Sequence, residues 1–293
     1  MTKLTGKLAE TMIKNEIVNK AVDYIMMHIG ENIQVEDIAQ HCHYSKFYLN
    51  RMFREATGES LHAFIKRVRM EQRAFRLKVE KNKSITDIAL DYGYSSSNYS
   101  SAFRKHHNIS PADFRKTILE KSVSENPNWE NYNDRMKARI MSYDECDKYI
   151  SIEQIEDMFV IYQRIKGNYH DMEQMWCAFC NKYEEYLTPE SVMLESTYDD
   201  PSITNPDECL YDLCVTADKS CMLKNTRVMP GGKFAVFHFK GNIWEIYPVH
   251  QSLLGIWFPG SGYAIDSRYG FDIYRFIDRK TMYMEIDICI PVR

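Results

Sequence analysis

Two stretches of the chain, fifty residues apart, share one arrangement of apolar and polar positions. In each, a short segment with apolar residues at helical spacing is followed by a turn and then by a second such segment. The segments are VEDIAQHC with SKFYLNRMFREA, and ITDIALDY with SSSNYSSAFRKHH. Apolar residues that recur every three or four positions indicate helices that bury one face. The pattern therefore predicts two helix-turn-helix units of the same layout.

The two units form an internal duplication. Ten positions are identical when the sequence is shifted by fifty, and in the first copy these are Asp37, Ile38, Ala39, Tyr44, Ser45, Phe53, Arg54, Ser60, Phe64 and Lys66. Ser45 and Ser95 stand where a helix N-cap belongs. Turns are expected at four residues that tolerate or favour a turn, namely His43, Gly93, Gly58 and Asn108.

The second helix of each unit leaves one face free of the core. In such units this helix enters the DNA major groove, where Arg can bind guanine and Asn can bind adenine through two hydrogen bonds. In the first unit we expect the DNA contacts to be Ser45, Lys46, Phe47, Asn50, Arg51 and Arg54. In the second unit they are Ser96, Ser97, Asn98, Ser100, Ser101 and Arg104. A solvated helix face would explain one unit alone, but two copies in register favour DNA binding.

The second unit is poorer in long polar side chains than the first. Serine hydroxyls reach phosphates and discriminate bases weakly, so this unit is expected to position the protein more than it specifies sequence. Between the units, SLHAFIKRVRMEQRAFRLKVEK contains neither Gly nor Pro. A helix of about 20 residues is about 30 Å long, close to the roughly 34 Å of one DNA turn. One rod would thus place two recognition helices in successive major grooves.

Residues 14–117 resemble the DNA-binding region of the AraC/XylS family of bacterial transcription regulators. The resemblance is carried by YSKFYLNRMF, GYS and the tail HHNISPADFRK, in which Ser110, Pro111, Phe114 and Arg115 look like the family's closing motif. The resemblance implies that Phe47, Asn50 and Arg51 face the bases.

The pattern changes after residue 118. SVSENPNWENYND is polar and broken by proline, which is typical of a linker, and we place that linker at 119–149. Beyond it, an aromatic strand ending in Lys-Gly-Asn precedes a helix twice, at 166–168 and at 240–242. The expected fold is multidomain: an all-α domain over 1–118, then an α+β domain over 150–293 made of two pseudo-repeated βαββ halves with a cleft between them.

Aromatic residues and one acid are candidates for a ligand site in this second domain. They are Trp244, Tyr247, Trp257, Phe258, Tyr263, Asp272 and Tyr274. Aromatic faces attract cations and a half-buried carboxylate neutralises them, although core packing explains most aromatics at such spacing. PGGKFAVFHFKG, WFPGSGY, FDIY and CIPVR resemble the GyrI-like (Rob-type) effector-binding domain. That resemblance implies a pocket for small, often cationic and lipophilic molecules, as in multidrug sensing.

The balance of basic and acidic residues changes at about the same place in the chain as the pattern of apolar and polar positions. Residues 1–120 hold 19 Lys and Arg against 14 Asp and Glu, whereas residues 121–293 hold 18 against 27. A basic half joined to an acidic half fits a nucleic-acid reader fused to another domain. No run of 18 apolar residues and no apolar leader occurs, and the eight cysteines show no framework or metal-ligand spacing. We therefore expect a cytoplasmic protein without cofactor or metal.

These observations favour a sequence-specific transcription regulator, which we expect to be an activator, with a small-molecule effector. The expected partners are double-stranded DNA, RNA polymerase and the effector, with no membrane. Two alternatives stay open. One is a constitutive DNA-binding regulator whose C-terminal domain binds a protein partner, and the other is a hydrolytic GyrI-like domain with Asp272 as base. No nucleophile paired with a base is visible, so we do not expect an enzyme.

Overall fold

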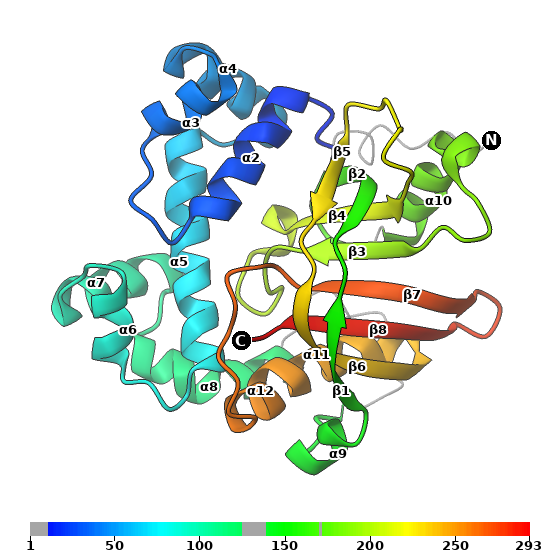
Figure 1. The fold of residues 1–293 in the computed structure, drawn as a ribbon. Helices are drawn as coiled ribbons and strands as arrows, with labels where there is room; N and C mark the ends of the chain where they lie inside the picture. The colour runs from blue at the N-terminus through cyan, green and yellow to red at the C-terminus, as the bar shows by residue number, and fades with distance from the viewer. Residues whose placement is uncertain (1–10, 125–138, 170–171) are drawn as a thin grey trace.

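The N-terminal half of the protein forms a helical domain that stands beside a sheet domain (Figure 1). The computed structural model describes residues 11–124, 139–169 and 172–293, with the backbone alone for residues 119–124. The helices are α2 (Glu16–His28), α3 (Val35–Cys42), α4 (Lys46–Thr57), α5 (Leu61–Val79), α6 (Ile85–Asp91), α7 (Ser96–His107) and α8 (Pro111–Ser124). The rod α5 separates the pair α3–α4 from the pair α6–α7, so the duplicated helix-turn-helix layout is confirmed.

Local chemistry explains where these helices begin and end. The hydroxyl oxygens of Ser45 and Ser95 accept hydrogen bonds from the backbone N–H groups of Tyr48 and Asn98, both at 3.3 Å, as N-cap residues do. The expected turn residues all adopt positive φ angles: 61° at His43, 70° at Gly93, 80° at Gly58 and 57° at Asn108. Helix α8 continues to Ser124, six residues past residue 118, where the helical domain was expected to end.

The C-terminal domain is an eight-stranded sheet of order β1-β6-β8-β7-β3-β4-β2-β5, with all neighbours antiparallel. Its strands are β1 (Ile150–Ile155), β2 (Met158–Lys166), β3 (Met193–Thr197), β4 (Leu210–Thr216), β5 (Thr226–Met229), β6 (Gly232–Asn242), β7 (Phe271–Asp278) and β8 (Tyr283–Pro291). Its helices are α9 (Tyr143–Asp147), α10 (Met172–Lys182), α11 (Ile246–Ser252) and α12 (Phe258–Gly260).

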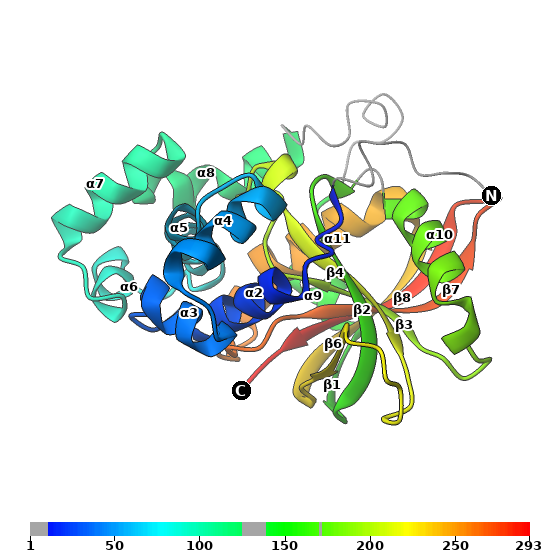
Figure 2. The ribbon, with the colours of Figure 1, turned by 90° about the horizontal axis from the view of Figure 1, so that it is seen from above.

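Two halves of this sheet mirror one another in strand order. The first half is β2-α10-β3-β4 and the second is β6-α11-β7-β8, so the two expected βαββ halves are confirmed. They meet where β3 pairs with β7 at the middle of the sheet. Helices α10 and α11 lie on the same face of the sheet (Figure 2). On the opposite face, Leu194, Ile273 and Phe271 belong to a separate apolar core.

Buried charges join the helical domain to the sheet. The guanidinium of Arg164 in β2 is fully buried and donates to both carboxylate oxygens of Asp212, at 2.9 and 2.8 Å. The same guanidinium donates to Asp23 of α2 at 2.7 Å and to the backbone oxygen of Asn19 at 3.1 Å. Arg227 also pairs with Asp212, at 2.8 Å. We call these five residues the interdomain charge network.

The network keeps its carboxylate ionised in spite of burial. Burial alone raises the pKa of Asp212, but the charges of Arg164 and Arg227 outweigh it, so its pKa lies below the ordinary value. A second ionic contact flanks the network, where the ammonium of Lys166 lies 2.6 Å from Glu208 and 3.6 Å from Glu59. The two domains therefore hold one another through interactions that neither domain could complete alone.

Asp212→Asn tests the interdomain charge network. It leaves the buried guanidinium of Arg164 and the partly buried one of Arg227 short of a counter-charge, and breaking a buried pair costs about 3–5 kcal/mol. Guanidinium chloride unfolding followed by circular dichroism should show a loss of that order. As a control, Glu16→Gln removes an exposed partner 3.4 Å from Lys224 and should leave the stability unchanged. Equal stabilities of Asp212→Asn and wild type would contradict the assignment.

Candidate DNA-binding face and effector site

Helix α4, the second helix of the first unit, buries one side and exposes the other. Leu49, Met52 and Phe53 are buried in the helical core. On the opposite side Phe47 is 79% exposed, although a phenyl group at a helix surface loses the stabilisation that burial gives. Lys46 is exposed and pairs with Glu36 of α3 at 2.7 Å. The helix thus offers an apolar and a cationic group on one face, as the sequence predicted.

Aromatic side chains order the exposed face of α4. The guanidinium of Arg51 lies 5.1 Å from the ring centre of Tyr48, and this ring stacks on Tyr44 at 5.4 Å. Tyr48 is 42% exposed and was not among the predicted contacts, since helical spacing alone does not show that its ring supports an arginine. Ser45 serves as the N-cap, and Arg54 is exposed in the last turn.

Asn50 is half-buried and already has a partner. Its side-chain oxygen accepts a hydrogen bond from the backbone N–H of Leu61 at 3.0 Å, at the first residue of α5. Two-bond recognition of adenine needs both the oxygen and the amide of an Asn side chain. Asn50 therefore links α4 to the start of α5. This is a long-range contact that the spacing in the sequence did not show.

Helix α7 presents small polar groups in the positions equivalent to α4. Tyr99 and Phe103 are buried, and Ser100 is half-buried. The remaining predicted contacts are exposed, namely Ser96, Ser97, Asn98, Ser101 and Arg104. The hydroxyl of Ser97 lies 3.3 Å from that of the N-cap Ser95. At the positions of Phe47 and Arg51 this face has Ser97 and Ser101, so it lacks the exposed phenyl ring and that arginine of the first unit.

A cluster of acidic groups lies where the two halves of the sheet meet. Glu195 of β3 and Asp272 of β7 are direct partners in the strand register, and they are 4% and 8% exposed. The imidazole Nε2 of His250, from α11, is 3.0 Å from an Asp272 oxygen. The hydroxyl of Tyr274 donates to Glu195 at 2.8 Å. We call these four residues the central acidic cluster.

The central acidic cluster is short of positive charge. Burial, assisted by the charge of Asp272, raises the pKa of Glu195 to about 8. Burial lowers the pKa of His250, but Asp272 and Glu195 more than reverse this, so the pKa lies above its ordinary value. At neutral pH Glu195 is thus largely protonated, while the imidazole of His250 lies against Asp272. Trp176 of α10 makes an edge-to-face contact with Tyr274 at 5.3 Å and completes an aromatic side.

The predicted ligand residues do not form one group. Asp272 and Tyr274 belong to the central acidic cluster, but Trp257 and Phe258 are 2% and 3% exposed in a core near α9, where the Trp257 indole donates to Asp147 at 2.9 Å. Tyr263 stacks on Trp257. Trp244 and Tyr247 are half-buried beside and within α11. Glu195 and His250 were missed, and the one hint in the sequence was an acid inside the apolar strand VMLEST.

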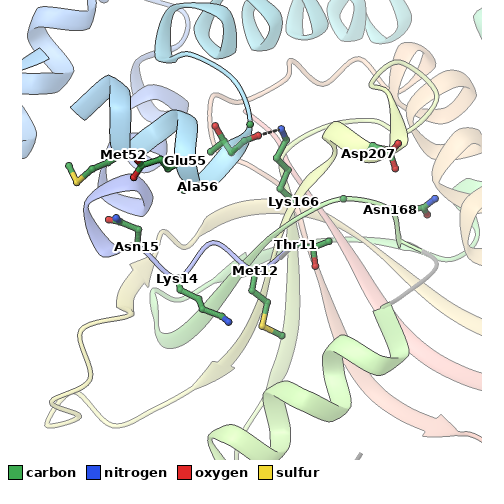
Figure 3. Close-up of a pocket in the computed structure, with 13 residues that line it drawn as sticks. Thr11, Met12, Lys14, Asn15, Met52, Glu55, Ala56, Lys166, Asn168 and Asp207 are labelled. Atoms are coloured by element: carbon green, nitrogen blue, oxygen red, sulfur yellow. Dashed lines mark hydrogen bonds between the residues drawn. The ribbon is translucent and has the colours of Figure 1, made fainter. Parts of the chain in front are cut away.

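An open groove of about 970 Å³ lies between the end of α4 and the sheet domain (Figure 3). Lys166 lies in it, and its ammonium donates to the Thr57 carbonyl oxygen and pairs with Glu208. The groove is lined by Thr11, Met12, Lys14, Asn15, Met52, Glu55, Ala56, Thr57, Gly58, Lys166, Gly167, Asn168 and Asp207. The charge of Lys166 is thus already neutralised by the protein, which makes the groove a weaker candidate site than the central acidic cluster.

Among the residues that the structure describes, no group of three or more His, Cys, Asp or Glu side chains is placed to hold a metal ion. No helix in that part of the chain combines the length and the apolar character needed to cross a membrane.

Comparisons with known proteins agree with this division of the chain. A family profile described as a helix-turn-helix domain matches residues 38–117, and one described as a GyrI-like small molecule binding domain matches residues 149–293. The regulatory protein SoxS of Salmonella typhimurium is 33% identical over 108 residues, which are 36% of this chain and 100% of that protein.

Two further relatives show different extents of similarity. The right origin-binding protein of Escherichia coli is 22% identical over 296 residues, covering 94% of this chain and 98% of its own. Among solved structures, the C-terminal domain of the response regulator AraT from Geobacillus stearothermophilus is 31% identical, with a TM-score of 0.33. It covers 35% of this chain and 86% of that one.

Arg51→Ala tests the exposed face of α4. Loss of a guanine-reading arginine should weaken binding to a DNA duplex selected by the wild-type protein by about 1–3 kcal/mol and relax one base preference. The matched control is Ser101→Ala, fifty residues later in the repeat, which should have a smaller effect. Fluorescence anisotropy against a set of single-base variants measures both. Unchanged base preference in Arg51→Ala would show that another side chain reads the DNA.

Asn50→Ala separates a structural role from a reading role. The substitution removes the acceptor for the Leu61 N–H, so it should lower the free energy of unfolding by about 1 kcal/mol, as loss of a helix cap does. Base preference on the selected DNA should stay as in the wild type. A changed preference with unchanged unfolding would contradict this assignment.

Proposed function

The chain belongs to the AraC/XylS family of DNA-binding transcription regulators and carries a GyrI-like small molecule binding domain, and we propose that its effector is a lipophilic organic cation bound at the central acidic cluster. The single observation that carries this assignment is the pair Glu195–Asp272, two buried acidic side chains in direct register, with only the imidazole of His250 from α11 against Asp272.

The charge balance of the cluster supports a cationic effector. Glu195 stays largely protonated at neutral pH because its ionised form would be a second buried negative charge beside Asp272. A bound cation would take over the role of that proton. The aromatic faces of Trp176 and Tyr274 would attract the charge of a lipophilic cation and bury its apolar groups.

On the DNA side, we propose that α4 and α7 enter successive major grooves. The 19 residues of α5 span about 28 Å at 1.5 Å per residue, close to one DNA turn. A monomer would then bind two unlike half-sites, with Arg51 and Phe47 of the first unit providing most of the sequence discrimination. The second unit would mainly hold phosphates through Arg104 and the serines of α7.

We expect the protein to work as a regulator in the cytoplasm, beside RNA polymerase and as an activator of transcription. It should bind its effector without transforming it, because the contacts of the central acidic cluster are those of charge neutralisation. A chemical probe incubated with the protein should therefore be recovered unchanged by mass spectrometry.

Titration with tetraphenylphosphonium, a lipophilic monovalent cation, tests the proposed function. Binding should release a proton from Glu195, so affinity should rise as pH approaches about 8, by up to about tenfold per pH unit. Among the other groups that face Glu195, the neighbouring acids Asp272 and Glu195 raise the pKa of His250, and Tyr274 stays neutral because burial raises its pKa. Calorimetry in buffers of different ionisation enthalpy counts the protons.

Glu195→Gln is the matched control for this titration. It keeps the shape of the site but has no proton to release, so the rise with pH should shrink and the proton count should fall. At 100 times its dissociation constant the probe should stabilise the wild type by about 2.7 kcal/mol. Absence of binding, or an affinity independent of pH in the wild type, would rule out this effector class.

A further inference from the structure

One short helix touches both the central acidic cluster and the DNA-binding domain. In α11, His250 contacts Asp272 with its Nε2 at 3.0 Å. The next residue, Gln251, is 1% exposed, and its side-chain oxygen accepts a hydrogen bond from the ammonium of Lys78 at 2.5 Å. Lys78 lies in the last turn of α5. Two adjacent side chains therefore connect the effector site with the rod that carries both helix-turn-helix units.

The ammonium of Lys78 is buried and donates hydrogen bonds to several side chains besides Gln251. It is 1% exposed and also donates to Asp200 at 2.5 Å and to the hydroxyl of Ser202 at 3.2 Å. A buried charge that loses a partner is strongly destabilised, so the Lys78 side chain is expected to follow its partners rather than release them. Movement of Gln251 is thus passed to the backbone of α5.

A second contact lies one turn further along each element. The ammonium of Lys81, just after α5, donates to the backbone oxygen of Gly255 at 2.5 Å. Gly255 lies in the π-helical turn Leu253–Trp257 that follows α11. Val79 packs in the same apolar cluster as Leu253 and Trp257. The polar contacts and this apolar cluster together join α11 to the C-terminal end of α5.

The position of this junction matters for DNA binding. The second unit begins at once, since α6 starts at Ile85 with Ser84 as its N-cap. The first unit is attached elsewhere, through Asp23 of α2 and the buried guanidinium of Arg164 in β2. Figure 1 shows α11 near the lower end of α5, where α8 also lies, and far from α4.

We propose that α11 transmits the state of Asp272 to the end of α5, and that a change of charge there alters the DNA contacts of the second unit more than those of the first. This inference rests on the proposed effector site. Since Glu195 and Asp272 are 4% and 8% exposed, a ligand that touches them must displace the side chains that cover them, and His250 of α11 is one of these.

The test is a double-mutant cycle on the full chain without any effector. Asp272→Asn removes the charge that holds His250, and Gln251→Leu removes the link to Lys78. The dissociation constant for a DNA duplex selected by the wild type is measured for the four proteins. Asp272→Asn should change it by about fivefold or more in the wild-type background, as is usual for coupled sites, and by less than about twofold with Gln251→Leu. Equal changes in both backgrounds, or no change in either, would overturn the proposal.

A second variant keeps the proposal testable if Gln251→Leu does not fold. Lys81 is exposed, so Lys81→Met should fold normally while losing its contact with Gly255, and it should also reduce the effect of Asp272→Asn. Lys83→Met is the matched control, because Lys83 pairs with Asp91 inside the second unit and should leave the effect intact. A reduction of equal size by both lysine variants would count against transmission through α11.

Hydroxyl-radical footprinting assigns the effect to one unit. Asp272→Asn should change protection over the half-site that α7 faces and leave that of α4 as in the wild type. Altered protection at the α4 half-site alone would contradict the proposal. Because no ligand is used, a failed titration with tetraphenylphosphonium would reject the effector class, whereas a failed cycle would reject transmission.

Discussion

The buried guanidinium of Arg164 is the contact on which the arrangement of the two domains depends. An ionised side chain without solvent must find opposite charge inside the protein, and Arg164 finds it both in its own sheet, at Asp212, and in helix α2, at Asp23. Neither domain alone satisfies it, so the helical domain is fixed in position on the sheet. At this contact the cation comes from the acidic half of the sequence and the carboxylate from the basic half, so it depends on individual buried groups and not on the net charge of either half.

The interdomain charge network and the central acidic cluster differ in one respect that gives them different uses. In the interdomain charge network, guanidinium groups keep the pKa of Asp212 low, so this group stays ionised and its geometry is fixed. In the central acidic cluster, one imidazole serves two carboxylates, and burial beside Asp272 raises the pKa of Glu195 to about 8. The first arrangement is balanced and suits a structural joint. The second has room for one more positive charge and suits recognition of a cation.

Much of this fold could be predicted from the sequence because its determinants are local. Each of these determinants acts within a few residues: the repeat at a spacing of fifty, the N-cap serines, the four turn residues and the two Lys-Gly-Asn strand ends.

The site was predicted only in part, because strand register and helix docking are long-range. Glu195 becomes a partner of Asp272 only when β3 pairs with β7, and Asn50 becomes a tie only when α5 starts beside it. Trp257 looked like a ligand residue, and its indole instead completes a core by bonding Asp147.

The central claim is that binding of a cation at the central acidic cluster changes the structure at the end of α5. Hydrogen–deuterium exchange of the full chain, with and without saturating tetraphenylphosphonium, tests it most directly, because backbone exchange reports local opening along the whole chain. The account predicts changed exchange in α11, in the last turns of α5 and in α6 and α7, with α2 to α4 unchanged. Changes confined to the sheet domain would contradict this claim. They would mean that the two domains are in contact but that cation binding does not alter the helical domain.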